Sequence, residues 1–281
     1  MRRLEKMILL VLLTWLAAVT FADATDVQDA KPKRVLVILD RADLPWLNIL
    51  TQSLQAALQS TSPYPVDLHI EYTDQGRYPD DIHRQKLTEL YRLKYVDAPM
   101  DLVIGVGDEA ADLLVEYGVR LFGEIPMIII SANPKTLQRD FLKPNMTSLL
   151  WGADIQGNVT LIEELMPNTR RLFIVSGSSL SDREVQKLAQ TSLREYQGPL
   201  EINYIDDDSQ AALLEKVAQL PENAALLYLV FNRDAKGAAF VSREMLSAIS
   251  AKANAPVFGI LETYLGYGIV GGSLLSAEVQ G

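Results

Sequence analysis

The stretch Gly105-Val-Gly107-Asp-Glu-Ala110 has residue types and spacing that could bind a nucleotide. Its pattern is G-x-G-x-x-A, and it lies where an apolar, strand-like run gives way to a helix-like run. In dinucleotide-binding folds, such glycines let the backbone approach a pyrophosphate whose charge is held by the N-terminus of the helix. The pattern therefore raises nucleotide binding as a first hypothesis.

Two features of the same stretch argue against a nucleotide. The helix would open with Asp108 and Glu109, and two carboxylates at the positive end of a helix stabilise that end themselves and repel a pyrophosphate. An acidic residue for the ribose is expected about 20 residues further on, but Ser131 and Asn133 stand there. We therefore interpret the turn as one rim of a solute pocket, with both acids capping the helix and Asp108 at the mouth. A nucleotide-dependent α/β enzyme stays open as an alternative.

The sequence gives little support for hydrolytic or metal-dependent chemistry. The sequence has only two histidines, His69 and His83, which we interpret as ordinary edge or surface residues. The stretch Gly177-Ser-Ser-Leu-Ser-Asp182 lacks the second glycine of a nucleophile elbow. The acids at 206–208 lack the spacing of a calcium loop and are expected to form a turn and cap the next helix. We predict no catalytic residue, no cofactor and no metal.

Polar residues gather at the ends of the predicted strands, where open α/β sheets bind ligands. Serine, asparagine, aspartate and glycine predominate at these ends, with aromatic residues interleaved. A cleft with aromatic walls and a few polar groups suits a small polar or amphipathic solute. The predicted ligand-binding residues are Asp40, Trp46, Gly107, Asp108, Ser131, Asn133, Trp151, Ser176, Ser178, Asn232, Asp234, Glu262 and Tyr264.

Apolar runs of strand length alternate with helical patterns along the chain, and this order positions the candidate residues. Repeated strand–helix–strand units predict parallel sheets with right-handed crossovers. Helices are expected over 47–60 and 80–95; Asp154 caps a further one, and Ser181 with Glu184 makes a capping-box pattern. The predicted strands span 34–40, 66–72, 101–107, 126–131, 147–152, 171–177, 200–206, 225–231, 256–261 and 268–275.

So many strands fit two sheets better than one open sheet, since sheets usually hold about five or six strands. We therefore predict an α/β protein with two Rossmann-like lobes, lobe 1 over 33–151 and lobe 2 over 152–262. Residues 263–281 are expected to cross back toward lobe 1. Because no covering helix follows the last predicted strand, we expect the domain to be truncated at this point.

The N-terminus predicts export. Basic residues precede an apolar run from Met7 to Ala22, and Ala22-Asp23-Ala24 is typical of a signal-peptide cleavage site. The run is short for a spanning helix, which needs roughly 20 residues, but an uncleaved anchor stays open. Residues 1–24 are thus a predicted signal peptide or inner-membrane anchor, and 25–32 a polar linker to a periplasmic or extracytoplasmic body.

The bulk composition disfavours several functions. The 281 residues carry a net charge of −10 without a basic cluster, so we predict no nucleic-acid partner. The absence of cysteine excludes a disulfide framework, cysteine-ligated zinc, a cysteine nucleophile and a lipoprotein anchor.

In this arrangement the sequence resembles the type I periplasmic binding fold, and within it the ABC-transporter substrate-binding-like family. That family also occurs as the extracellular sensor region of bacterial histidine kinases. None of the resembling motifs is catalytic, so the resemblance implies a fold and a role class, not a ligand. It covers Lys33 to Gly281 and rests on KRVLVILDRADLPWLNILTQSLQAAL, DLVIGVGDEAADLL, IPMIIISANP, SLLWGADIQGNVTLIEELMPNTRRLFIVSG and PVFGILETYLGYGIVGGSLLSAEVQG.

The resemblance implies that a small solute, such as an amino acid or another small organic molecule, binds between two lobes that close on it by a hinge. It also implies a membrane-embedded partner, and a dimer if the chain is a sensor. We favour the ligand-sensing portion of a membrane-bound signalling protein of the sensor histidine kinase type, working in two-component signalling. The alternative is a free substrate-binding subunit of an ABC uptake transporter.

Overall fold

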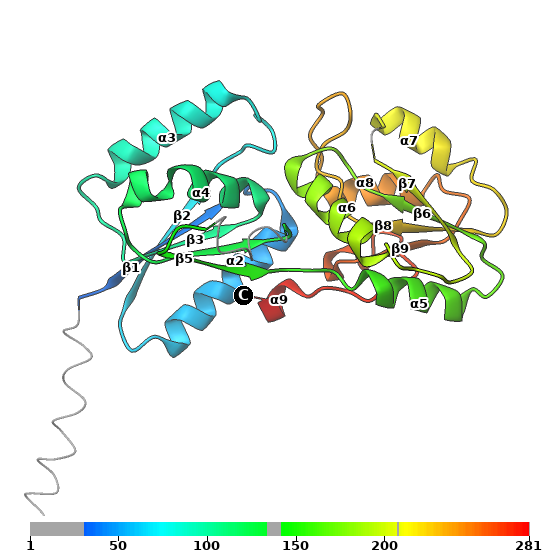
Figure 1. The fold of residues 1–281 in the computed structure, drawn as a ribbon, viewed down its shortest axis with the longest axis horizontal. Helices are drawn as coiled ribbons and strands as arrows, with labels where there is room; N and C mark the ends of the chain where they lie inside the picture. The colour runs from blue at the N-terminus through cyan, green and yellow to red at the C-terminus, as the bar shows by residue number, and fades with distance from the viewer. Residues whose placement is uncertain (1–30, 134–141, 207, 281) are drawn as a thin grey trace, which may run out of the picture.

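The computed structural model describes residues 31–133, 142–206 and 208–280 and has two α/β lobes (Figure 1). Lobe 1 is built on a five-stranded parallel sheet in the order β2-β1-β3-β4-β5. Its strands are β1 (Lys33–Leu39), β2 (Val66–Tyr72), β3 (Leu102–Val106), β4 (Met127–Ser131) and β5 (Met146–Leu150). Its helices are α2 (Pro45–Thr61), α3 (Asp81–Tyr95) and α4 (Asp108–Phe122).

Lobe 2 is built on a four-stranded parallel sheet in the order β7-β6-β8-β9. Its strands are β6 (Arg171–Val175), β7 (Glu201–Ile205), β8 (Ala224–Tyr228) and β9 (Val257–Gly259). Its helices are α5 (Ile155–Leu165), α6 (Leu180–Ser192), α7 (Gln210–Val217) and α8 (Ser242–Ser250), with the short helix η2 (Glu262–Tyr264) beyond β9. The predicted fold class, two Rossmann-like lobes with parallel sheets, is confirmed.

Helices cover both faces of the lobe 1 sheet, and the side chains of β1 show why. Val35 and Val37 pack into one buried cluster, together with Leu50 of α2. Leu36 lies in another cluster with Leu87 of α3. Since successive strand residues point to opposite faces, a strand buried on both sides must be apolar throughout.

The predicted strand over 268–275 is wrong. This segment makes only isolated bridges, from Gly271 to Phe258 and from Leu275 to Leu261. Gly268 has a φ of 103°, which is outside the strand region and interrupts the extended backbone. Beyond it, the short helix α9 (Ala277–Gln280) packs against α2, so the chain returns to lobe 1 (Figure 1).

Helix caps were predicted correctly in one place and wrongly in another. Asp154 caps α5, as expected, by accepting a bond of 2.8 Å from the amide of Gly157. The capping box of α6, however, is formed by Ser179 and Asp182. Two S-x-x-acid patterns overlap here, and Ser181 is engaged elsewhere, as described below.

The predicted division between residues 151 and 152 stays a prediction. The structure shows only that β5 belongs to the first sheet and that α5 begins four residues after Trp151. The predicted signal peptide or anchor lies outside the described residues. Among the helices that are described, none is both long and apolar enough to cross a membrane.

Candidate functional site

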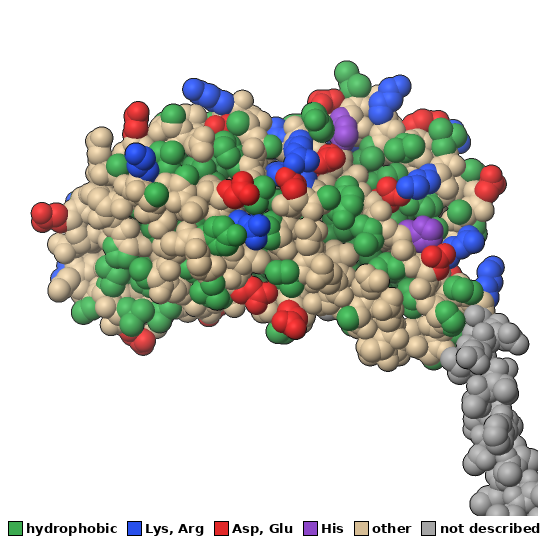
Figure 2. Space-filling view, turned by 180° about the vertical axis from the view of Figure 1, so that it is seen from behind, with side chains coloured by type: hydrophobic (Ala, Val, Ile, Leu, Met, Phe, Trp, Pro, Cys, Tyr) green, Lys and Arg blue, Asp and Glu red, His purple; other side chains and the backbone are tan. Residues whose placement is uncertain are grey.

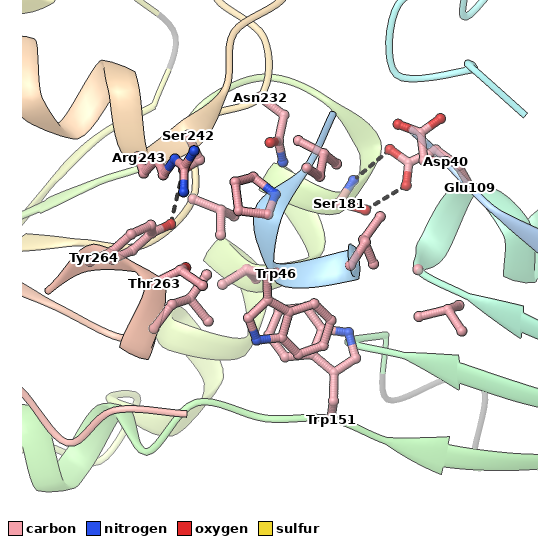
Figure 3. Close-up of a pocket in the computed structure, with 18 residues that line it drawn as sticks. Asp40, Trp46, Glu109, Trp151, Ser181, Asn232, Ser242, Arg243, Thr263 and Tyr264 are labelled. Atoms are coloured by element: carbon pink, nitrogen blue, oxygen red, sulfur yellow. Dashed lines mark hydrogen bonds between the residues drawn. The ribbon is translucent and has the colours of Figure 1, made fainter. Parts of the chain in front are cut away.

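A cavity of about 90 Å³ lies between the two lobes, and we call it the inner cavity (Figure 3). Lobe 1 contributes residues that follow its strands or begin its helices α2 and α4. Lobe 2 contributes the start of α6, the first turn of α8, residues that follow β8, and η2 with the residue before it. The lining residues are Asp40, Leu44, Pro45, Trp46, Leu47, Val106, Gly107, Glu109, Trp151, Ser181, Val185, Val230, Asn232, Ser242, Arg243, Leu261, Thr263 and Tyr264.

One wall of the inner cavity is aromatic. The rings of Trp46 and Trp151 have centroids 5.3 Å apart and planes tilted by 34°. The indole Nε1 of Trp46 is buried and has no hydrogen-bond partner among the described residues. Since a buried donor without a partner costs about 1–3 kcal/mol, this group favours a bound molecule that offers an acceptor.

The lobe 2 end of the cavity carries donors. Ser242 Oγ lies 2.9 Å from the hydroxyl of Tyr264, which in turn donates to the carbonyl of Leu229 at 2.7 Å. Arg243 places its guanidinium 5.1 Å from the ring centre of Tyr267, and its Nε lacks a partner within the described chain. Figure 3 shows Arg243, Ser242 and Tyr264 across the cavity from Asp40 and Glu109.

The lobe 1 end carries two buried acids. Asp40 follows β1 and accepts bonds from the amide of Gly76 at 2.8 Å and the hydroxyl of Thr73 at 3.0 Å. Burial nevertheless raises the pKa of Asp40 above its ordinary value. Glu109 stands in the first turn of α4, and burial, reinforced by the charge of Asp40, raises its pKa to about 8.

Glu109 also links the lobes. Its carboxyl group accepts two hydrogen bonds from Ser181, one from the backbone amide at 3.2 Å and one from the hydroxyl at 2.5 Å. Ser181 belongs to the first turn of α6, which is in lobe 2. Sequence reasoning missed Glu109 as a site residue, because its helix-start position suggested only a cap.

The predicted capping role of Asp108 and Glu109 is wrong. The N-cap of α4 is Gly107, and no side chain caps this helix. Asp108 instead accepts from the hydroxyl of Ser131 and, at 3.2 Å, from the amide of Asn133. Burial raises the pKa of Asp108 to about 6. Each carboxyl group thus has a hydrogen-bond partner outside its own helix.

The structure brings six of the predicted ligand-binding residues to the inner cavity: Asp40, Trp46, Gly107, Trp151, Asn232 and Tyr264.

The remaining predicted residues lie elsewhere. Asp108, Ser131 and Asn133 bond to one another beyond β4, and the buried Ser176 follows β6. Ser178 and Asp234 line a second, outer cavity, and Glu262 accepts a hydrogen bond from the amide of Ala277 at 2.7 Å.

Besides Glu109, the prediction missed three residues of the inner cavity: Ser181, Ser242 and Arg243. The sequence signal that could have found these residues is their position in the first turn of a helix.

The outer cavity has a volume of about 390 Å³ and lies on the other side of Glu109. Its residues are Gln75, Gly76, Pro79, Arg84, Glu109, Asp112, Ser178, Ser179, Leu180, Arg183, Arg233, Asp234, Ala235 and Gly237. Figure 2 shows basic and acidic side chains gathered where the lobes meet. Since Glu109 lines both cavities, its bond to Ser181 separates them.

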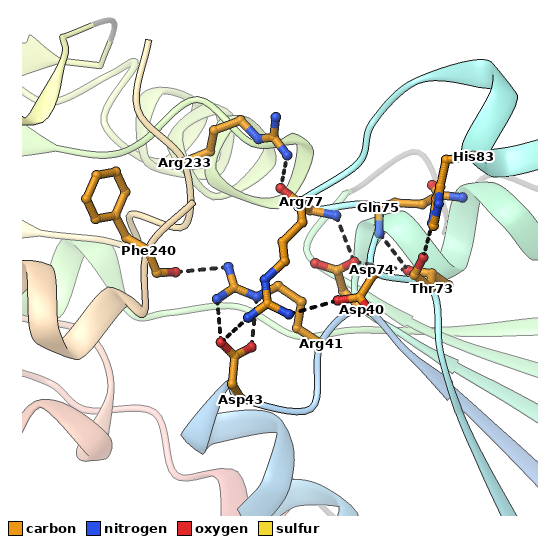
Figure 4. A network of polar contacts seen from close by, with 11 residues as sticks. Asp40, Arg41, Asp43, Thr73, Asp74, Gln75, Arg77, His83, Arg233 and Phe240 are labelled. Atoms are coloured by element: carbon orange, nitrogen blue, oxygen red, sulfur yellow. Dashed lines mark hydrogen bonds and ion pairs between the residues drawn. The ribbon is translucent and has the colours of Figure 1, made fainter. Parts of the chain in front are cut away.

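Two further contacts hold the lobes together (Figure 4). The buried Arg41, which is paired with Asp43 at 2.8 Å, donates to the carbonyl of Phe240 at 2.9 Å. Arg233 donates to the carbonyl of Gly76. Together with the bond between Glu109 and Ser181, these contacts fix a closed arrangement.

A substitution at Gly107 is expected to destabilise the protein by about 1–3 kcal/mol, because its φ of 95° is strained for a residue with a Cβ. Urea unfolding of Gly107→Ala measures this cost. Gly152→Ala is the matched control, since its φ is not positive and its added Cβ meets nothing closer than 3.7 Å. Equal stability of the two variants would contradict the expectation.

In the described part of the chain, no three His, Cys, Asp or Glu side chains come together in a way that could hold a metal ion.

Comparisons with known proteins concern the fold. No family model matches the sequence, and a search of curated proteins found no match. A conserved domain protein from Vibrio cholerae has a similar structure, with a TM-score of 0.61 and 18% identity over 86% of this chain and 79% of that one. An ABC domain from Streptococcus pneumonia in complex with L-Trp has a TM-score of 0.60 and 16% identity, over 89% and 81% of the chains.

A solute binding protein from R. palustris in complex with benzoate is also similar, with a TM-score of 0.56 and 16% identity. The match covers 82% of this chain and 62% of that chain. At these identities the likeness shows a shared fold.

Proposed function

The chain has the fold of type I periplasmic binding proteins, and we propose that it is an extracytoplasmic domain that binds a small solute in the inner cavity. The observation that carries this proposal is that both lobes line the cavity. Contacts from both lobes exist only when the lobes are together, so a solute shifts the population toward the closed arrangement. The cavity is small for a binding site, which usually holds about 300–1,000 Å³, so the lobes part to admit the solute.

Small organic molecules, including amino acids, fit the chemistry of this cavity best. The tryptophan wall accommodates an apolar body, Trp46 Nε1 and Arg243 offer donors, and Asp40 offers an acceptor at the opposite end. L-Trp and benzoate, the solutes of two structural neighbours, likewise combine an aromatic ring with a carboxylate.

We favour the sensor role over transport, on the resemblance described above. In this role the domain passes lobe closure through the membrane to a cytoplasmic kinase, as a dimer. The coding sequence after residue 281 distinguishes the two roles. An apolar span of about 20 residues supports a sensor, whereas a stop codon after one more strand and helix supports a free transporter subunit.

A thermal-shift screen of amino acids, organic acids, sugars and purines tests solute binding. A true solute at 100 times its Kd is expected to stabilise the protein by about 2.7 kcal/mol. Trp46→Ala is expected to weaken its binding at least tenfold, because the substitution removes both the aromatic wall and the free donor. Tyr64→Ala, at an exposed position that does not line the cavity, is the control. If no compound in the screen raises the melting temperature, the proposal is contradicted.

A further inference from the structure

The outer cavity has spare donors from both lobes. Gln75 of lobe 1 is 4% exposed, and its amide nitrogen has no hydrogen-bond partner in the described residues. Arg183 and Arg233 of lobe 2 each donate to a backbone carbonyl, of Ser178 and Gly76 respectively. Neither arginine lies within ion-pair distance of a carboxylate of the described chain. Two arginines without an ion pair in the described residues and one buried amide without a partner therefore line this space.

Two acids of the outer cavity already have hydrogen-bond partners. Asp234 already accepts the amides of Gln210, Lys236 and Ala238 at 2.9–3.1 Å. Glu109 bonds to Ser181, and its raised pKa of about 8 leaves it mostly uncharged at neutral pH.

The carboxyl groups of Asp112 and Asp234 oppose an anion here. Burial raises the pKa of Asp112, while the charge of nearby Arg84 acts in the opposite direction. Arg84 forms an ion pair with Glu116 at 3.2 Å, so the two acids Asp112 and Asp234 are left to face Arg183 and Arg233, neither of which has an ion pair within the described residues. Figure 4 shows Arg233 reaching across to the loop that carries Gln75.

We propose that the outer cavity is a second binding site, for a small oxyanion that accepts hydrogen bonds from Gln75 in lobe 1 and from Arg183 and Arg233 in lobe 2. Carboxylate, phosphate and sulfate share this chemistry. An anion held by both lobes stabilises their closed arrangement. By thermodynamic linkage, it strengthens binding of a solute in the inner cavity, and the solute strengthens binding of the anion in turn.

Isothermal titration of the full chain with phosphate, sulfate and acetate, at constant ionic strength set with chloride, tests the site. Excluded salts stabilise proteins without binding, so only saturable heat at millimolar concentration counts. Saturable binding is expected for at least one of these anions. Arg183→Gln and Arg233→Gln are each expected to weaken it about tenfold or more, as the loss of a charged hydrogen bond implies.

A variant that strengthens binding makes the test independent of folding defects. Asp112→Asn removes one opposing charge, so it is expected to tighten anion binding about tenfold. Arg92→Gln, on the exposed surface of α3, is the control that changes net charge outside the cavity and leaves the Kd unchanged. The proposal is overturned if no anion binds saturably, or if the two arginine variants and Asp112→Asn bind as the unmodified chain does. Because Arg183 and Arg233 do not line the inner cavity, weaker binding in their variants assigns the anion to the outer cavity whether or not the inner cavity binds a solute.

Discussion

Raising the pH from 7 to 9 is expected to open the lobes, and Glu109→Gln is expected to abolish most of this opening. The pKa of Glu109 is raised to about 8 in the closed arrangement, because the carboxyl group is buried and lies near Asp40. When the lobes part, the carboxyl group meets water and its pKa returns to about 4.3. The closed state thus binds the proton more tightly than the open state.

The direction of the effect follows from proton linkage. A group whose pKa is raised by closure gives its full stabilisation below its open-state value and loses it as the pH rises through its closed-state value. Between about pH 5 and 8, one linked proton changes the ratio of open to closed molecules by up to tenfold per pH unit. Asp40 and Asp108 also have raised pKa values, so the variant retains some dependence at lower pH.

The absence of cysteine makes the measurement direct. Cysteines introduced as Lys86→Cys on α3 and Glu195→Cys beyond α6 carry one label in each lobe, and the distance between labels is followed against pH. Glu89→Gln, at an exposed glutamate on α3, is the control and should keep the full dependence. An unchanged profile for Glu109→Gln between pH 7 and 9 would assign the titration to another group.

Asp182→Ala is expected to destabilise the protein by about 3–5 kcal/mol, much of a typical total of about 5–15 kcal/mol. Asp182 is fully buried, and its carboxylate accepts the amides of Ser179, Asn232 and Arg233 at 3.0–3.2 Å. It also accepts the side-chain amide of Asn232 at 2.9 Å. Alanine leaves these donors buried without a partner, which costs far more than the bonds themselves contribute.

Urea unfolding followed by circular dichroism measures the loss. Asp80→Ala is the matched control: Asp80 also caps a helix, but at an exposed site and through a single bond to His83, so about 1 kcal/mol is expected. A cost for Asp182→Ala no larger than for Asp80→Ala would contradict the argument. Because Asp182 positions Asn232, solute binding in the inner cavity should weaken as well.

The sheets could be predicted because the parts of strands that are covered on both faces, such as β1 from Val35 to Leu39, must be apolar. The prediction of a strand over 268–275 was wrong because it relied on the apolar residues of this segment. The φ of Gly268, which lies outside the strand region, could not be read from that pattern. Local patterns also failed to choose between Ser179 and Ser181 as the cap of α6, since both have an acid three residues on.

The site was harder to predict than the fold, because its partners are distant in the chain. Glu109 and Ser181 are 72 positions apart, and no local pattern relates them. Strand ends identified Asp40, Trp151 and Asn232, since those positions follow from the sheet alone. Arg243 begins a helix, and only the packing of the two lobes brings its first turn to the inner cavity.

Within the described residues, the chain passes between the lobes after β5 and again between Leu275 and α9 (Figure 1). These crossings are tied to each other, since Ser273 Oγ donates to Asp154 at 3.0 Å and its carbonyl accepts from Asn158. Two fixed crossings define a single rotation axis, whereas one flexible connection would also allow twisting and sliding. Little orientational freedom is then lost when the lobes meet, so most of the contact energy of a bound molecule remains available as affinity.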